Sequence, residues 1–246
     1  GTVMVKDIVS GSDSSSPALL TAVGNTLYFS ADDGTHGYEL WKSDGTASGT
    51  VMVKDIGSGS GNSGPEYLTA VGNTLYFSAS DNEGNGRELW KSDGTANGTV
   101  MAKEFHSGSS SSNPDYLIVV GNTLYFSAYD GTNGYELWKS DGTTNGTVMV
   151  KDINSGLFGS SPEYLTAVGN TLYFSAEDGT NGTELWKSDG TASGTVMVKD
   201  ITSGSGSSSP KHIAAVGNTL YFSADDGTNG TELWKSDGTA SGTVMV

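Results

Sequence analysis

The sequence predicts an all-β fold made of five near-identical repeats. Five tryptophans recur every 48 or 49 residues, and the five prolines keep the same period. Each repeat holds four short segments rich in Val, Leu, Tyr, Phe and Trp, bounded by turn residues, and no segment shows the apolar period of a helix. Glycine, at 36 of 246 residues, interrupts the chain throughout. We therefore expect almost no helix and five four-stranded antiparallel units.

The fourth repeat shows the four expected strands in order, at residues 164–168, 171–176, 184–188 and 195–201. A two-residue connection, Gly169-Asn170, joins the first two strands, because both residue types tolerate the positive φ of a tight hairpin. The stretch EDGTNG joins the second strand to the third, and DGTASG joins the third to the fourth. The repeat is thus an up-and-down sheet of antiparallel neighbours.

Stacking of these sheets follows from the second strand of each repeat. In the fourth repeat Leu172, Tyr173 and Phe174 are consecutive, so both faces of that strand need cover. Four antiparallel strands per repeat, covered on both faces, are typical of a β-propeller blade. We predict one repeat domain, residues 1–246, with blades at 17–56, 65–105, 114–153, 162–201 and 210–246.

The recurring aromatic residues are interpreted as structural core. A tryptophan and a Tyr-Phe pair in every blade compensate for a low content of aliphatic residues, since each large buried side chain contributes about 1.5 to 3 kcal/mol. The predicted core tryptophans are Trp41, Trp90, Trp138, Trp186 and Trp234.

One outer strand is surplus. GTVMV or a near copy occurs six times, whereas the other three segments occur five times each. Residues 1–8 therefore have no blade of their own. Either they close the ring on the last blade, where residues 242–246 compete for the place, or they pair with the edge of another chain. A third alternative is that the chain is a length of a longer array.

Composition limits the classes of function. The formal net charge is -16, which makes nucleic acid and anionic membrane surfaces poor partners. No apolar run approaches the length of a membrane helix, and no signal peptide is expected. The chain has no cysteine, and its histidines, His36, His106 and His212, lie at three different phases of the repeat. No nucleophile with a base recurs, so we expect no catalytic residues and no enzyme.

Acidic residues recur in two loops of each repeat. The loop between the second and third strands is interpreted mainly as an Asp-Gly turn, with calcium as the alternative, because carboxylate oxygens near glycine suit that ion. The candidate ligands are Asp33, Asp81, Asp130, Asp178 and Asp226. A glutamate at the start of each third strand, such as Glu39, lies three residues before a lysine and is expected to balance charge across strands.

The octapeptide ELWKSDGT appears in all five repeats, and it resembles the ELWxxDGT repeat of large bacterial secreted and surface proteins. The resemblance covers essentially the whole chain, with the second copy departing most. It implies an extracellular propeller-like module and supplies no catalytic residue. The chain is also similar in blade length and number to five-bladed lectin propellers, whose sugar-binding motifs it does not show.

These observations together favour a non-enzymatic scaffold or adhesion module of a secreted or surface-attached bacterial protein, with a glycan or surface protein as partner. One alternative is a multivalent lectin that binds through exposed loop aromatics such as Tyr38 and Tyr135. Another is a strand-exchanged oligomer or fibre that self-associates through residues 1–8.

Overall fold

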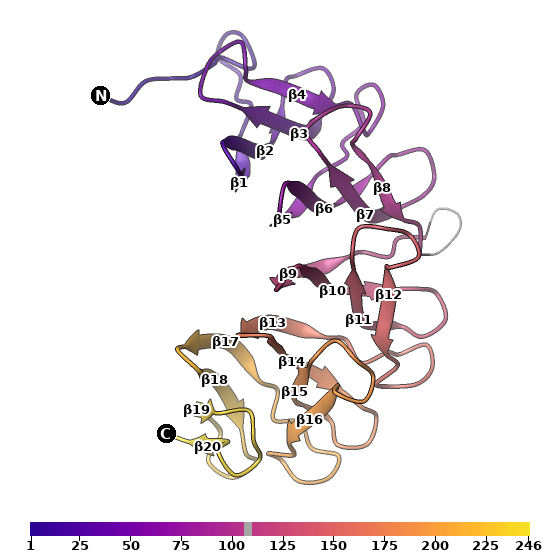
Figure 1. Ribbon diagram of the computed structural model, residues 1–246, viewed down its shortest axis with the longest axis vertical. Coiled ribbons are helices and arrows are strands. Elements are labelled where there is room, and N and C mark those ends of the chain that lie inside the picture. The colour runs from indigo at the N-terminus through magenta and orange to yellow at the C-terminus, as the bar shows by residue number, and fades with distance from the viewer. Residues whose placement is uncertain (106–109) are drawn as a thin grey trace. The chain divides into compact units, whose positions relative to one another are not determined.

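The computed structural model describes residues 1–105 and 110–246, and all of their regular secondary structure is strand. His106 lies outside the described residues. Among the described residues there is no helix with the length and hydropathy needed to cross a membrane. The chain divides into two compact units (Figure 1): unit 1 comprises Gly1–Asp115 with Gly142–Thr144, and unit 2 comprises Tyr116–Asp141 with Asn145–Val246.

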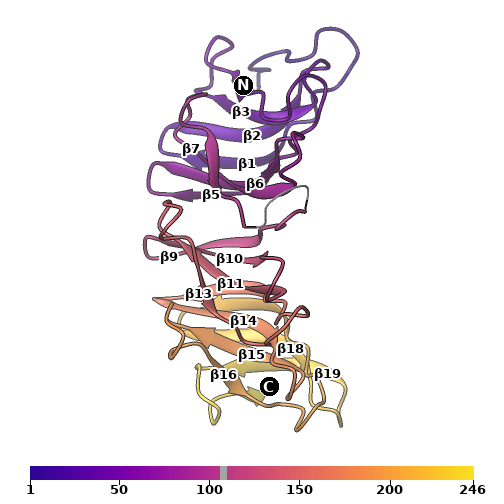
Figure 2. The same cartoon turned by 90° about the vertical axis from the view of Figure 1, so that its right-hand side faces the viewer.

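Unit 1 contains two four-stranded antiparallel sheets, each with its strands in chain order. Their strands are β1 (Ala18–Val23), β2 (Thr26–Asp32), β3 (Tyr38–Ser43) and β4 (Val51–Lys54), then β5 (Glu66–Val71), β6 (Thr74–Ser80), β7 (Arg87–Ser92) and β8 (Val100–Lys103). Figure 2 shows these two sheets as layers, with β1 and β2 above β5 and β6.

Unit 2 contains three sheets of the same order. Their strands are β9 (Asp115–Val120), β10 (Thr123–Tyr129), β11 (Tyr135–Ser140) and β12 (Val148–Lys151), then β13 (Glu163–Val168), β14 (Thr171–Glu177), β15 (Thr183–Ser188) and β16 (Val196–Lys199), then β17 (Lys211–Val216), β18 (Thr219–Asp225), β19 (Thr231–Ser236) and β20 (Val244–Met245). The first residue of β9 belongs to unit 1.

The fourth strand of each sheet is shorter than the sequence predicts. In the fourth repeat β16 covers Val196–Lys199 rather than residues 195–201. Thr195 instead closes the preceding turn, where its hydroxyl pairs with Ser188 Oγ at 2.7 Å and donates to Thr191 O at 2.7 Å. Ile201 turns away to donate its N–H to Glu184. Local side-chain bonds therefore limit the ladder at both ends.

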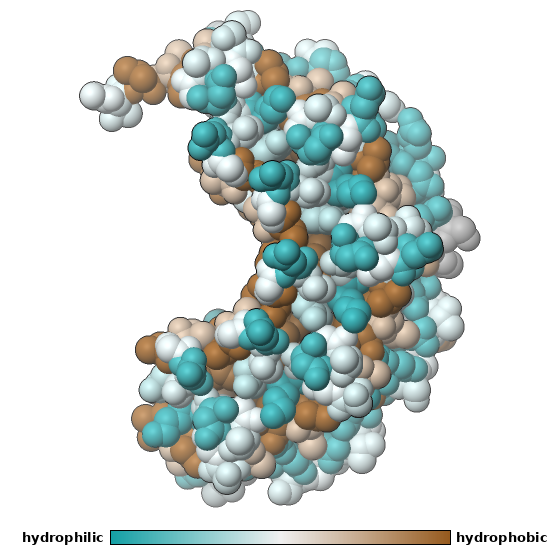
Figure 3. Space-filling view, in the orientation of Figure 1, coloured by the Kyte–Doolittle hydropathy of each residue, from teal (hydrophilic) through white to brown (hydrophobic). Residues whose placement is uncertain are grey.

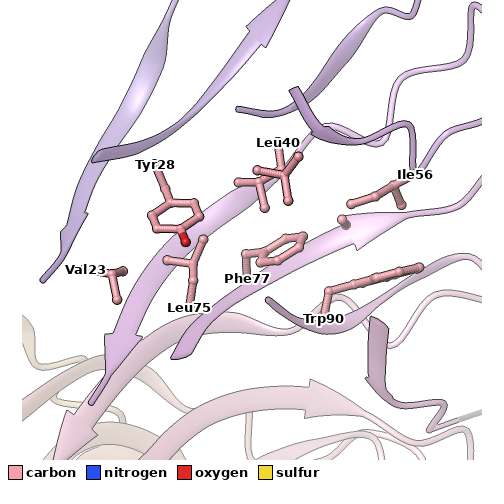
Figure 4. Packing of buried hydrophobic residues seen from close by; sticks show 9 residues of the cluster. Val23, Tyr28, Leu40, Ile56, Leu75, Phe77 and Trp90 are labelled. Carbon is pink, nitrogen blue, oxygen red and sulfur yellow. The ribbon is translucent and has the colours of Figure 1, made fainter. Parts of the chain in front are cut away.

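The core lies between stacked sheets rather than within one sheet. Figure 4 shows the cluster in unit 1, where one side is Val23, Tyr28, Leu40 and Ile56 of the first sheet with its linker, and the other side is Leu75, Phe77 and Trp90 of the second sheet. An equivalent cluster in unit 2 joins the β13–β16 sheet to the β17–β20 sheet. All five tryptophans are buried, between 5% and 6% exposed. Within each unit, stacked sheets therefore shield one another.

Residues 1–8 form no strand in this structure. They make an arm that leads into the β1–β4 sheet, and Figure 3 shows hydrophobic surface on it. Val3 and Met4 in this arm are 80% and 78% exposed. The inner part of the arm is packed: Ile8 contacts the cluster of Phe29, Ala31 and Trp41. Ring closure and pairing with another chain both stay predictions.

Candidate functional site

The ELWKSDGT octapeptide binds successive sheets together, beginning with its glutamate. Glu39 is fully buried and accepts four hydrogen bonds from the linker between the first two sheets. The donors are Ile56 N at 2.9 Å, Gly57 N at 3.0 Å, Ser63 N at 3.1 Å and Ser63 Oγ at 2.7 Å. Burial raises the pKa of Glu39, although these donors lower it. Our expectation of charge balance with Lys42 was wrong, because the carboxylate faces backbone N–H groups of the linker.

The lysine of the octapeptide reaches the next sheet. Lys42 Nζ donates to Gly94 O at 2.8 Å, and Lys139 and Lys187 make the same bond to Gly190 O and Gly238 O. Tyr28 lies against the same glycine, and a Cβ on Gly94 would overlap its hydroxyl. Gly94 also has a φ of 87°, where other residues are strained. The glycine is required by both its backbone conformation and its neighbour.

The tryptophan of the octapeptide receives a lysine from the preceding sheet. Lys54 Nζ lies 5.6 Å from the centre of the Trp90 ring and donates to Thr99 O at 2.9 Å. Lys199 makes the same two contacts, with the Trp234 ring at 5.6 Å and with Thr243 O at 2.8 Å. The cation is thus held by a ring face and a carbonyl together.

The remaining residues of the octapeptide close a turn. Ser43 Oγ and Thr50 Oγ1 lie 2.7 Å apart, and Asp44 accepts hydrogen bonds from Thr46 N at 2.9 Å and Thr46 Oγ1 at 2.8 Å. The hydroxyl of Thr46, followed by its N–H, lowers the pKa of Asp44. Every position of the octapeptide except the leucine therefore has a polar, ring or conformational role. The leucine is fully buried in the first four copies and 51% exposed in the fifth, at Leu233.

The candidate calcium ligands lie in the loops between the second and third strands, and each already accepts bonds from its own loop. Asp226 accepts Thr228 N at 2.9 Å, Asn229 N at 2.7 Å and Asn229 Nδ2 at 2.7 Å. The Asn229 donors, with Thr228 N–H, lower the pKa of Asp226. The same pattern occurs at Asp33, Asp130 and Asp178, and Asp81 uses Glu83 N and Asn85 Nδ2.

The structure does not bring these aspartates together. In the part of the chain that it describes, no three His, Asp or Glu side chains form a group that could hold a metal ion. In each loop the two oxygens of the candidate aspartate are engaged by backbone and asparagine or histidine groups. The first and fifth loops also hold Asp32 and Asp225, which accept Gly34 N and Gly227 N at 2.7 Å. Calcium binding at these loops stays a prediction.

The two candidate ligand aromatics lie at the start of third strands. Tyr38 is 37% exposed, and its backbone is held by Asn62 Oδ1 at 2.7 Å and Gly64 N at 3.1 Å. Tyr135 is half-buried and packs on Tyr129, with ring centres 5.5 Å apart. Only Tyr38 offers an exposed ring, and the equivalent positions in the other sheets are Arg87, Thr183 and Thr231.

Sequence analysis missed an aromatic row on the first strands. Tyr116, Tyr164 and His212 are each the second residue of their strand, and all have φ between 53° and 56°. Their rings form a row with centres 6.1 and 5.9 Å apart, and neighbouring rings are tilted by 47° and 59° to each other. A polar cavity of about 180 Å³ lies beside Tyr164, lined also by Glu163, Glu177 and Lys211. The signal available in the sequence was an aromatic residue two positions after four of the five prolines, with Leu19 in that place after Pro17.

No protein-family model and no curated protein matches the sequence. Several solved structures match its fold. The computationally designed Ika8 protein has a TM-score of 0.53 and 18% identity over 97% of this chain and 63% of that one. Prolyl oligopeptidase B from Galerina marginata has a TM-score of 0.59 and 12% identity, over 95% of this chain and 36% of that one. Oligopeptidase B from Leishmania major has a TM-score of 0.55 and 14% identity, over 95% and 33%.

The chain spans less than two thirds of the Ika8 chain and about a third of the two peptidase chains. At these identities the likeness shows the fold alone. Together with the five repeated sheets, it defines an all-β repeat protein whose four-stranded antiparallel sheets are blades of the β-propeller type.

Proposed function

We propose that this chain is a non-enzymatic scaffold or adhesion module of an ELWxxDGT-repeat protein that acts outside the cell. Five copies of ELWKSDGT support the family assignment, and the family supports the extracellular location. The peptidase likeness supports no activity, because this chain corresponds to about a third of those proteins and shares 12% to 14% of their residues.

One observation carries the scaffold proposal. Recurring residues of the octapeptide contact the neighbouring blade or its linker: Glu39 accepts linker N–H groups, Lys42 donates to Gly94 O, and Lys54 lies over the Trp90 ring. The position before each ELW differs between blades, being Tyr, Arg or Thr. A constant frame with a variable position in each repeat is typical of repeat proteins that display a binding surface.

The test is a binding screen against a glycan array and against cell-surface proteins, with the intact chain. We expect no saturable glycan binding. Saturable binding that is lost in Tyr38→Ala but kept in Tyr67→Ala would overturn the scaffold proposal and support a lectin. Tyr67 is the matched control, because it is 40% exposed against 37% for Tyr38 and lies on a first strand, whereas Tyr38 begins a third strand.

A further inference from the structure

The polar cavity beside Tyr164 lies between the fourth and fifth blades. Its volume is about 180 Å³, and every residue that lines it belongs to unit 2. Three charged side chains line it, those of Glu163, Glu177 and Lys211. Within the described part of the chain, no hydrogen bond or ion pair engages any of these three side chains. The cavity therefore holds charged groups that the fold itself does not use.

The second blade shows what the equivalent place in a blade holds. Arg87 is the residue before ELW in that blade, and its Nη1 donates to Gly64 O at 2.8 Å and to Ser78 O at 3.1 Å. Glu66 Oε2 lies 3.6 Å from the same nitrogen. All of these residues belong to unit 1. The guanidinium is thus held by two carbonyl oxygens and a carboxylate.

The fourth blade contains the same set of acceptors. The residues that correspond to Gly64, Glu66 and Ser78 are Ser161, Glu163 and Ser175, and these three line the cavity. The strand register is the same in both blades, because Glu163 pairs with Ser175 as Glu66 pairs with Ser78. The backbone is also alike, since φ is 47° at Ser161 and 51° at Gly64. Both carbonyls and the carboxylate are therefore in place for a guanidinium.

The side chain that would fill the place is short in the fourth blade. The residue before ELW pairs across the sheet with the last residue of the second strand. This pair is Ser80 with Arg87 in the second blade and Glu177 with Thr183 in the fourth. The short side chain of Thr183 leaves open the place that Arg87 fills, and Glu177 adds a second carboxylate beside it.

Two differences from the second blade weaken the attraction for a cation without reversing it. Lys211 takes the place of Asp115, a carboxylate that interacts with Arg87. Ser161 takes the place of Gly64, where a Cβ would lie 3.0 Å from Arg87 Nη2, so a guanidinium in the fourth blade lies slightly further out. Because two carboxylates face one ammonium group, the net charge of the cavity still favours a cation.

We propose that the cavity between the fourth and fifth blades binds the guanidinium group of an arginine side chain from a partner protein. The guanidinium donates to the carbonyl oxygens of Ser161 and Ser175 and lies beside the carboxylates of Glu163 and Glu177. Its planar fork of donors suits acceptors on several sides, whereas an ammonium is a compact point charge. The half-buried ring of Tyr164 lines the same cavity. This site goes beyond the scaffold role and requires neither the family assignment nor the extracellular location.

The test is ligand-observed NMR of the intact chain with a blocked arginine, N-acetyl-arginine amide. We expect saturable binding with a Kd of about 1 mM, since the carboxylates are exposed. The matching citrulline derivative keeps the shape of the ligand and loses its charge, so it should bind about 10-fold more weakly or less. Absence of saturable binding by the arginine derivative, or equal binding of the two derivatives, overturns the proposal.

A variant that fills the cavity from within tests its location. Thr183→Arg gives the fourth blade the residue that the second blade has at this position, so we expect it to abolish binding. Ala192→Arg is the matched control, because it adds the same side chain at an exposed turn at the other end of β15. It should bind like the parent chain. Unchanged binding in Thr183→Arg, or equal loss in both variants, overturns the assignment of the cavity.

Variants of the charged residues should change the affinity in opposite directions. Glu163→Gln together with Glu177→Gln should weaken binding by about 10-fold. Lys211→Asp, which gives the fifth blade the charge that Asp115 supplies near Arg87, should tighten it by about 5-fold. A gain of affinity does not arise from misfolding, and circular dichroism checks the fold of each variant. A Lys211→Asp chain that binds no more tightly than the parent overturns the assignment of a cation to this cavity.

Discussion

The last two blades share an identical stretch of sequence, which lies in a different environment in each blade. Residues 183–198 and residues 231–246 are identical. In the fourth blade Glu184 and Leu185 are fully buried, whereas in the fifth Glu232 is exposed and Leu233 is 51% exposed. The tryptophan of the pair does not change, since Trp186 and Trp234 are 5% and 6% exposed. A residue's environment is therefore set by which neighbouring blade it faces.

The largest expected effect is the loss of a tryptophan. Trp186 and Trp234 each pack against the preceding blade. Trp186→Ala and Trp234→Ala should therefore each lower the free energy of unfolding by about 3 to 5 kcal/mol, and Trp138→Ala should lower it by a similar amount. Chemical denaturation measures the change. A Trp234→Ala variant as stable as the parent chain would contradict the comparison, because its burial equals that of Trp186.

The leucine pair sharpens the comparison. Leu185→Ala creates a cavity in a closed interface and should cost about 2 to 5 kcal/mol. Leu233→Ala removes a half-exposed side chain and should cost about 0.5 kcal/mol or less when measured at low protein concentration. Equal costs in the two blades would show that Leu233 is covered in the isolated chain.

The glutamate of the motif gives a pH-dependent difference. Burial raises the pKa of Glu136 from its ordinary value of 4.5 to about 7, against the hydroxyl and N–H donors that lower it. Stability from the neutral carboxyl is complete below pH 4.5 and is lost as pH rises towards 7. The advantage of the parent chain over Glu136→Gln should therefore shrink between pH 4 and about pH 8.

The measurement for Glu136 is urea unfolding of parent and variant at several pH values. Glu232→Gln is the matched control, because Glu232 is the same residue of the octapeptide in a blade where it is exposed. A parent-minus-variant difference that grows as pH rises would contradict the assignment of the effect to the buried carboxyl of Glu136.

The smallest expected effect is that of a chelator. The loops of the fourth and fifth blades hold Asp178 and Asp226 in the same network of N–H and asparagine donors, without help from a neighbouring blade. We expect the melting temperature to be unchanged by EDTA. A clear fall would assign calcium to these loops, because a ligand bound only by the folded state must shift stability.

Much of the fold could be predicted from the sequence because its period is short and regular. The hairpin turn at Gly169-Asn170 and the strands beside it depend on local backbone preferences. The candidate site was harder. Glu39 precedes Lys42 by three residues, which suggested a local pair, but its partners lie 17 to 24 residues further along the chain. No sequence spacing shows such a contact, because the linker must first fold back over β3.

The sequence by itself determined the repeat, its four strands, its turns and the aromatic residues that fill each blade, since these follow from local propensity and apolar patterning. Only the tertiary structure decided what each motif residue contacts. Identical residues at positions 184 and 232 differ in burial and in hydrogen bonding because one faces a linker and the other faces solvent. A residue between two blades is buried only when both blades are in contact, and the sequence of one repeat specifies only one of the two contacting surfaces.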